Sequence, residues 1–121
     1  MIYTGYYAKA KQYQEVELEL VAISIGRPSA FRNCRKETEL MPSWDMVNGV
    51  KSGRMTKEDY AAIFNKKLEK LSAWSIEQIY RGCIFLCYEK PGEICHRHLV
   101  AEWLRANGFE CEEFKMEEKT K

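Results

Sequence analysis

Two thiols, two imidazoles, a guanidinium and a carboxylate lie close together in one short stretch of this chain. Cys87 and Glu89 come at the end of an apolar run, and Cys95, His96 and Arg97 follow a Pro-Gly turn. An apolar run, a turn and a helical pattern indicate a buried strand that leads into a helix, the half-unit of an α/β domain. Such domains bind ligands at the carboxyl ends of their strands, and a helix amino terminus attracts anions. The sequence therefore places a candidate site between this strand and this helix.

Several chemistries are open to these side chains. A Cys95 thiolate at the helix amino end, beside His96 and Arg97, is favoured in its ionised form, as in nucleophilic or redox-active cysteines. Alternatively, Arg97 holds an anion, His96 is a hydrogen-bond donor or general acid/base, and Glu89 orients His96 or accepts a ligand hydroxyl. Cys87 and Cys95 can also be small buried hydrophobic residues. A metal site is disfavoured, because tandem Cys-His lacks the paired spacings of zinc modules.

Residues that follow two other predicted strands extend this candidate site. In a mainly parallel sheet the carboxyl ends of the strands open on one edge. That edge would carry Thr4 and Tyr6 from the first strand, and Ser24 and Arg27 after the second. Tyr6 or Trp44 could stack on a ring of the ligand. Each of these residues also has a simpler interpretation, as a core aromatic residue or a surface charge.

The strands themselves are predicted from apolar or β-prone segments that end at turn residues. The strongest is the apolar run before Cys87, which is typical of a central parallel strand. We expect a three-layer α/β sandwich with a mainly parallel sheet of four to five strands over residues 1–114, and a loose charged tail over 115–121. The predicted strands lie at residues 2–6, 18–25, 37–40, 83–87 and 109–114.

Helices are predicted from apolar residues at helical spacing and from their capping residues. Thr56 and Ser75 are good amino-terminal caps, and Gly108 is a typical stop signal. Residues 9–16 fit either a short helix or a loop. The predicted helices lie at about residues 44–50, 56–71, 75–81 and 95–107.

Composition limits the classes of protein. The 121 residues, 45% of them hydrophobic, suit one domain with one core. The first residues do not resemble a signal peptide and no run approaches the roughly 18 apolar residues that span a bilayer, so we expect a cytoplasmic protein without membrane contact. Five cysteines in the cytosol are expected to be reduced.

The net charge of +1 gives no general attraction to nucleic acid. One window holds basic residues without an acid, and it is either a contact for an anion or a solvated loop: Arg27, Arg32, Arg35 and Lys36.

The segment 86–104 closely resembles an uncharacterised bacterial and phage family, domain of unknown function 488. The hallmark of that family is a Cys-x-Glu-Lys strand end followed by Cys-His-Arg, which stands here as Cys87-Tyr88-Glu89-Lys90 and Cys95-His96-Arg97. The start of the chain, residues 2–8, is similar to the Thr-Ser-Tyr-Phe-Ala opening of one branch of the family. Segments 22–24 and 40–43 occur in corresponding order, so the match covers most of the chain.

The resemblance implies a small α/β domain and a set of site residues, without a named reaction. Two departures from the family pattern stand out. Gly5 replaces the Ser of that branch, and residues 23–26 lack the Asp and Arg that broader relatives carry after the second strand. The site residues that the resemblance implies are Cys87, Glu89, Cys95, His96 and Arg97.

These patterns predict recognition of a small anionic ligand, nucleotide-like or derived from nucleic acid, at the strand carboxyl ends. They leave open whether a bond of the ligand is broken. One alternative is an enzyme in which His96 activates Cys95 as a nucleophile. Another is a phage or bacterial interaction or inhibitor protein that uses the basic window at 27–36. No motif identifies a cofactor or an oligomeric state.

Overall fold

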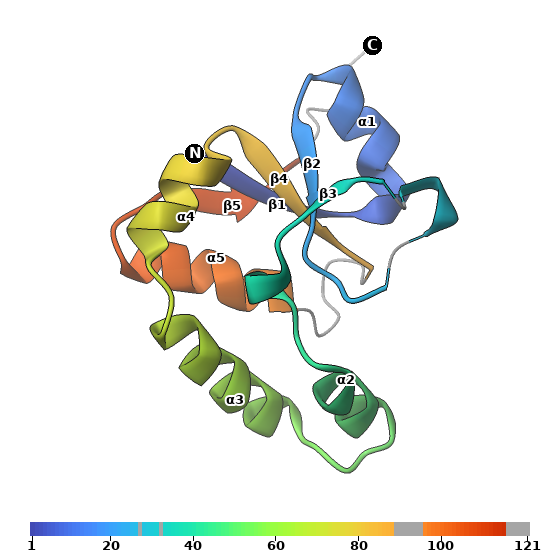
Figure 1. Ribbon diagram of the computed structural model, residues 1–121, viewed down its shortest axis with the longest axis vertical. Helices are drawn as coiled ribbons and strands as arrows, with labels where there is room; N and C mark the ends of the chain where they lie inside the picture. Colours follow the sequence, from blue (N-terminus) through green and yellow to red (C-terminus); the bar gives the residue numbers. More distant parts are fainter. Residues whose placement is uncertain (27, 32, 89–95, 116–121) are drawn as a thin grey trace.

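The structure is a computed structural model that describes residues 1–26, 28–31, 33–88 and 96–115. Its described strands form one sheet in the order β3-β2-β4-β1-β5, and every pair of neighbours is parallel. Helices cover both faces, which confirms the predicted three-layer α/β architecture (Figure 1). The strands are β1 (Ile2–Tyr6), β2 (Glu19–Ala22), β3 (Arg35–Lys36), β4 (Cys83–Cys87) and β5 (Cys111–Glu113).

The helices are divided between the two faces of this sheet. The short α1 packs on β2 from one side, whereas α3 and α4 pack with α5 on the other (Figure 1). None of the described helices is long and apolar enough to cross a membrane. The helices are α1 (Ala10–Glu15), α2 (Trp44–Lys51), α3 (Lys57–Glu69), α4 (Ala73–Tyr80) and α5 (His96–Ala106), with short 3₁₀-helices at Tyr7–Lys9, Ser29–Phe31 and Thr38–Leu40.

The connections after β2 and β4 leave these neighbouring strands in opposite directions. From β2 the chain runs outward to the edge strand β3, and from β4 it runs through α5 past β1 to the other edge, β5. Parallel strands are joined by right-handed crossovers, so connections that run in opposite directions lie on opposite faces. A crevice therefore opens at the carboxyl ends of β2 and β4, where open α/β sheets hold their ligands.

Strand β4 lies at the centre of the core and all of its residues are buried. Phe85 faces the cluster formed with α3 and α5, and Ile84 and Leu86 face the cluster around Tyr13 of α1. A central parallel strand buried on both sides needs an almost continuous apolar sequence. This requirement explains why the run before Cys87 was a reliable signal.

Two local predictions were wrong. Residues 37–40 are not a strand: Thr38–Leu40 is a 3₁₀-helix, and the Glu37 carboxylate accepts a hydrogen bond from the Glu39 N–H at its start. The strand β3 lies just before it, and its two residues are exposed and carry no apolar signal. Ser75 does not cap α4; Ser72 is the amino-terminal cap, and its hydroxyl accepts a hydrogen bond from the Ser75 N–H at 3.1 Å.

Gly5 lies where Tyr13 crosses β1, and there is no room for a side chain. A Cβ at this position would lie 2.6 Å from the Tyr13 hydroxyl oxygen and 2.8 Å from Cδ1 of Ile84, both on buried residues. We expect Gly5→Ala to lower the free energy of unfolding by about 1–3 kcal/mol through overpacking, measured by urea unfolding. Gly26→Ala is the control, since its nearest atom would be 3.9 Å away. Equal midpoints for the two variants would contradict this expectation.

Candidate functional site

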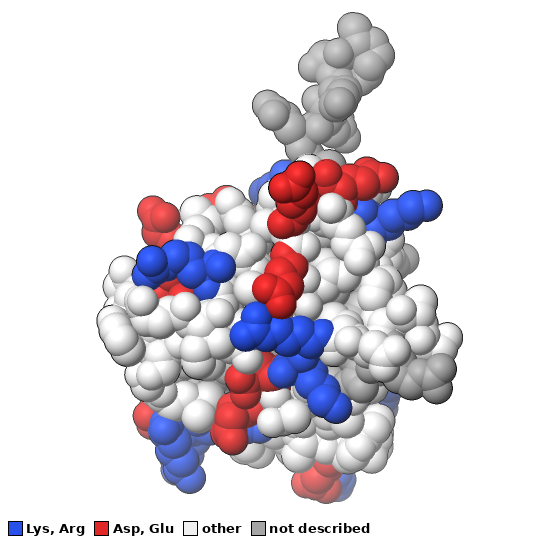
Figure 2. Space-filling view, turned by 45° about the horizontal axis from the view of Figure 1, so that its top comes forward, with Lys and Arg blue, Asp and Glu red and all other residues white. Residues whose placement is uncertain are grey.

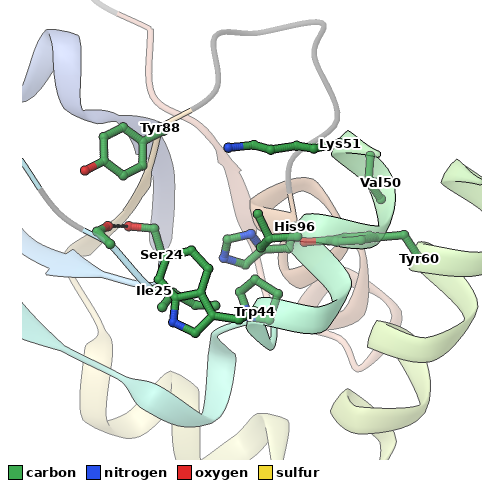
Figure 3. A pocket seen from close by; sticks show the side chains of 11 residues that line it. Ser24, Ile25, Trp44, Val50, Lys51, Tyr60, Tyr88 and His96 are labelled. Carbon is green, nitrogen blue, oxygen red and sulfur yellow. Dashed lines mark hydrogen bonds between the residues drawn. The ribbon is translucent and has the colours of Figure 1, made fainter. Parts of the chain in front are cut away.

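A cavity of about 480 Å³ lies in the crevice at the carboxyl ends of β2 and β4 (Figure 3). One of its walls is formed by Ser24, Ile25 and Gly26, which follow β2. Tyr88, directly after β4, and His96, the first residue of α5, complete this side. The cavity is therefore built from the segments that the sheet topology brings together.

The opposite wall comes mainly from α2. Ser43 caps this helix by accepting a hydrogen bond from the Met46 N–H at 3.1 Å, and Met46 is buried in the core. The rest of the helix is thereby placed along the cavity, with Tyr60 of α3 beside it (Figure 3). The residues on this side are Pro42, Trp44, Val47, Val50, Lys51 and Tyr60.

His96 is a buried, neutral imidazole. Its side chain is 4% exposed, its Nε2 is hydrogen-bonded to the carbonyl oxygen of Ile23, and its ring meets the edge of Phe64. The pKa of His96 is lowered to about 4, mainly by burial; the hydrogen bond to Ile23 opposes this shift, and the charges of Arg97 and Lys67 add to it. A carbonyl oxygen only accepts, so Nε2 carries the proton and Nδ1 is an acceptor.

Ser24 is the second buried polar side chain at the cavity wall. Its hydroxyl donates to the carbonyl oxygen of Gly26 at 2.5 Å and lies 2.8 Å from the hydroxyl of Tyr7. A serine hydroxyl has one proton, and Gly26 receives it. The Tyr7 hydroxyl must therefore be the donor in the second bond, which leaves Ser24 a further lone pair.

Arg97 belongs to a different cluster, which we call the Arg97–Glu113 network. The guanidinium is fully buried, and its Nε and Nη2 donate to the two carboxylate oxygens of Glu113 at 2.9 and 3.1 Å. Nη1 donates to Sγ of Cys87 at 3.1 Å, and the Tyr6 ring lies 5.6 Å away. Thr4 donates to the same carboxylate at 2.8 Å. None of these residues lines the cavity.

The structure thus separates the predicted site residues. The expectation that His96 and Arg97 converge on one cavity was wrong, because consecutive helical residues point about 100° apart and Glu113 takes up the guanidinium fork. Of the predicted residues, Ser24, Trp44 and His96 line the cavity; Thr4, Tyr6, Cys87 and Arg97 lie in or against the Arg97–Glu113 network; Arg27, Glu89 and Cys95 lie outside the described residues.

The cysteines also differ from expectation. Cys87 is disulfide-bonded, which corrects the prediction that all the cysteines are reduced, since sequence spacing does not reveal the distance between sulfur atoms. Cys34, Cys83 and Cys111 are not disulfide-bonded. Burial raises the pKa of Cys83 to about 11 and that of Cys111 to about 12, so these two are not activated nucleophiles. No group of three or more potential ligands within the described part of the chain is arranged to hold a metal ion.

Among the described cavity residues that sequence reasoning did not assign to a site, three carry polar or charged side chains. Tyr60 belongs to the apolar stripe of α3 and was expected only in the core, yet it lines the cavity as well. Lys51 stands at the end of α2 in no recognisable motif. Tyr88 directly follows Cys87 at the end of β4. Because side chains alternate between the two faces of a strand, the sequence indicated only that Tyr88 points away from Cys87.

Among the described residues, the positive charge at the cavity comes from a single lysine and not from a large basic surface (Figure 2). Figure 2 shows one face of the molecule, on which the acidic and basic side chains of the described residues lie next to each other without a large patch of either sign. Lys51 is the charged side chain among the described lining residues, and the cavity borders the amino end of α5. This combination favours a bound anion.

The chain was compared with protein-family models, curated proteins and solved structures, and none of them matches it. The resemblance to domain of unknown function 488 therefore stays a prediction from the sequence.

Proposed function

We propose that this protein binds a small anionic ligand with a planar ring, of the nucleotide class, in the cavity between β2, β4, α2 and α5. The observation that carries the proposal is the composition of the cavity: aromatic rings, one cation and two buried polar side chains. Its volume of about 480 Å³ lies within the range of about 300–1,000 Å³ that is common for small-molecule sites.

The aromatic side chains support a ligand with a flat ring. Trp44 is 60% exposed and Tyr88 is 48% exposed, although both are large apolar residues at the cavity wall. They extend from opposite sides of the cavity, Trp44 from α2 and Tyr88 from the end of β4 (Figure 3). A nucleobase could cover these rings, and stacking of one base on an aromatic side chain contributes about 1–3 kcal/mol.

Lys51 and the amino end of α5 support a negative charge on that ligand. No Asp or Glu is found among the described lining residues, and His96 is neutral, so nothing there cancels the ammonium charge. A phosphate bound near Lys51 would also gain from the helix N–H groups. The proposal therefore assigns phosphate binding to Lys51 and not to Arg97, whose fork is occupied by Glu113.

The direct test is binding of AMP, GMP, CMP and UMP, measured by thermal shift and calorimetry. A mononucleotide at 100 times its dissociation constant should add about 2.7 kcal/mol to stability. Trp44→Ala should weaken binding roughly 5- to 150-fold, since it removes the stacking surface. Trp74→Ala is the matched control, because Trp74 is 63% exposed on α4 and does not line the cavity.

A second pair of variants tests the charge. Lys51→Ala should weaken a mononucleotide more than the corresponding nucleoside, whereas Lys11→Ala, an exposed lysine on α1, should affect neither. The proposal fails if none of the four mononucleotides binds, or if the Trp44 and Trp74 variants bind equally well.

A further inference from the structure

We infer that the ligand presents hydrogen-bond donors, such as an exocyclic amino group or ribose hydroxyls, to the part of the cavity formed by Ser24 and His96. The inference rests on the proposed function and deepens it, because it states which polarity the buried edge of the ligand must have.

The first support is the hydrogen-bond geometry of His96. The proton of this neutral ring is on Nε2, which is committed to the Ile23 carbonyl oxygen. Nδ1 has no hydrogen-bond partner among the described residues, although only 4% of His96 is exposed to solvent. A neutral imidazole nitrogen without a proton can only accept. A group that meets this atom must therefore donate.

The second support is the hydroxyl of Ser24, one residue after Ile23. Its proton is given to Gly26, and the Tyr7 hydroxyl fills one of its two lone pairs. The remaining lone pair has no partner within the described part of the chain, and the side chain is only 6% exposed. To donate to a ligand, Ser24 would first have to give up the bond to Gly26. Its available role is again that of an acceptor.

These two acceptors lie together on one side of the cavity (Figure 3). Both are buried, so a carbonyl oxygen or phosphate placed against them would leave lone pairs facing lone pairs without water between them. Leaving a buried polar group without a partner costs about 1–3 kcal/mol. Sites built to pair with a particular polar group therefore reject analogues that lack it. The anionic group of the ligand belongs beside the Lys51 ammonium and not in contact with these two acceptors.

Analogues of one probe separate the two sources of donors. AMP is titrated by calorimetry beside purine riboside 5′-monophosphate, in which a hydrogen replaces the amino group, and beside 2′,3′-dideoxy-AMP, which lacks both ribose hydroxyls. We expect at least one analogue to bind roughly 5- to 150-fold more weakly than AMP, the range that corresponds to 1–3 kcal/mol. A loss with the purine riboside monophosphate identifies the amino group as the donor, and a loss with the dideoxy analogue identifies the ribose.

A pair of serine variants links this preference to the site. Ser24→Ala should reduce the ratio between AMP and the disfavoured analogue, whatever it does to affinity, while Ser52→Ala, an exposed serine outside the cavity, should leave the ratio unchanged. If AMP binds in a Trp44-dependent manner but both analogues bind equally well, the inference is wrong and the proposed function stands. If no mononucleotide binds, both are wrong.

Discussion

Replacing Glu113 by glutamine is expected to lower the free energy of unfolding by about 3 kcal/mol, because breaking a buried ion pair leaves a buried charge poorly compensated. The Glu113 carboxylate accepts two N–H groups of the fully buried Arg97 and the hydroxyl of Thr4. The amide of glutamine has the same shape but no charge, and its NH₂ group would face the guanidinium. Urea unfolding followed by tryptophan fluorescence measures the effect.

Glu112→Gln is the matched control for this prediction. Glu112 is the neighbouring residue of β5 and is exposed, so the same chemical change removes a solvated charge. Its free energy of unfolding should stay within about 0.5 kcal/mol of the unmodified protein. Similar losses for the two variants would mean that Arg97 does not depend on Glu113 for its stability in the core.

Acid is expected to destabilise the protein between pH 6.5 and about 4 through His96. The unfolded imidazole has a pKa near 6.5, and burial lowers the folded pKa to about 4. Below pH 6.5 the unfolded state therefore binds a proton that the folded state does not, so stability is full above this pH and falls with acid. Each pH unit costs about 1.4 kcal/mol, so the loss over this window approaches about 3 kcal/mol.

Two histidine variants isolate this effect, since the chain contains only two histidines. His96→Gln should flatten the dependence of the urea midpoint on pH between 7 and 4.5, even if it lowers stability at every pH. His98→Gln should remove a smaller part, because partial burial and the charge of Arg97 also lower the pKa of His98. Parallel pH curves for the unmodified protein and His96→Gln would show that His96 titrates normally.

Local chemistry made most elements of the fold predictable. Thr56 forms a capping box with Asp59, and Gly108 has a φ of 91°, the left-handed conformation that ends a helix. The apolar run of β4 needed no tertiary information, since only a buried strand suits it. The edge strand β3 was missed because its two residues pair with β2 while their side chains stay in solvent. No apolar pattern arises from such a contact.

The site was predictable only in part, for a different reason. The argument from strand ends led to Ser24 and His96, because it depends on where a parallel sheet exposes its carboxyl edge. It assigned Arg97 to a ligand, because a basic residue at a helix amino end favours an anion. In the structure the anion beside Arg97 is the Glu113 carboxylate. Glu113 lies there because β5 pairs with β1, which places it opposite Thr4. Only the strand order reveals this neighbour.

The two edges of the sheet limit how this protein can associate with other chains. The edge strands β3 and β5 are two and three residues long, and both carry charged side chains. A long flat edge offers a row of free N–H and C=O groups to which a foreign strand can pair, and short charged edges offer few. The folded protein is therefore a poor template for fibril growth, and the apolar β4 becomes an aggregation hazard only when β2 or β1 beside it has opened.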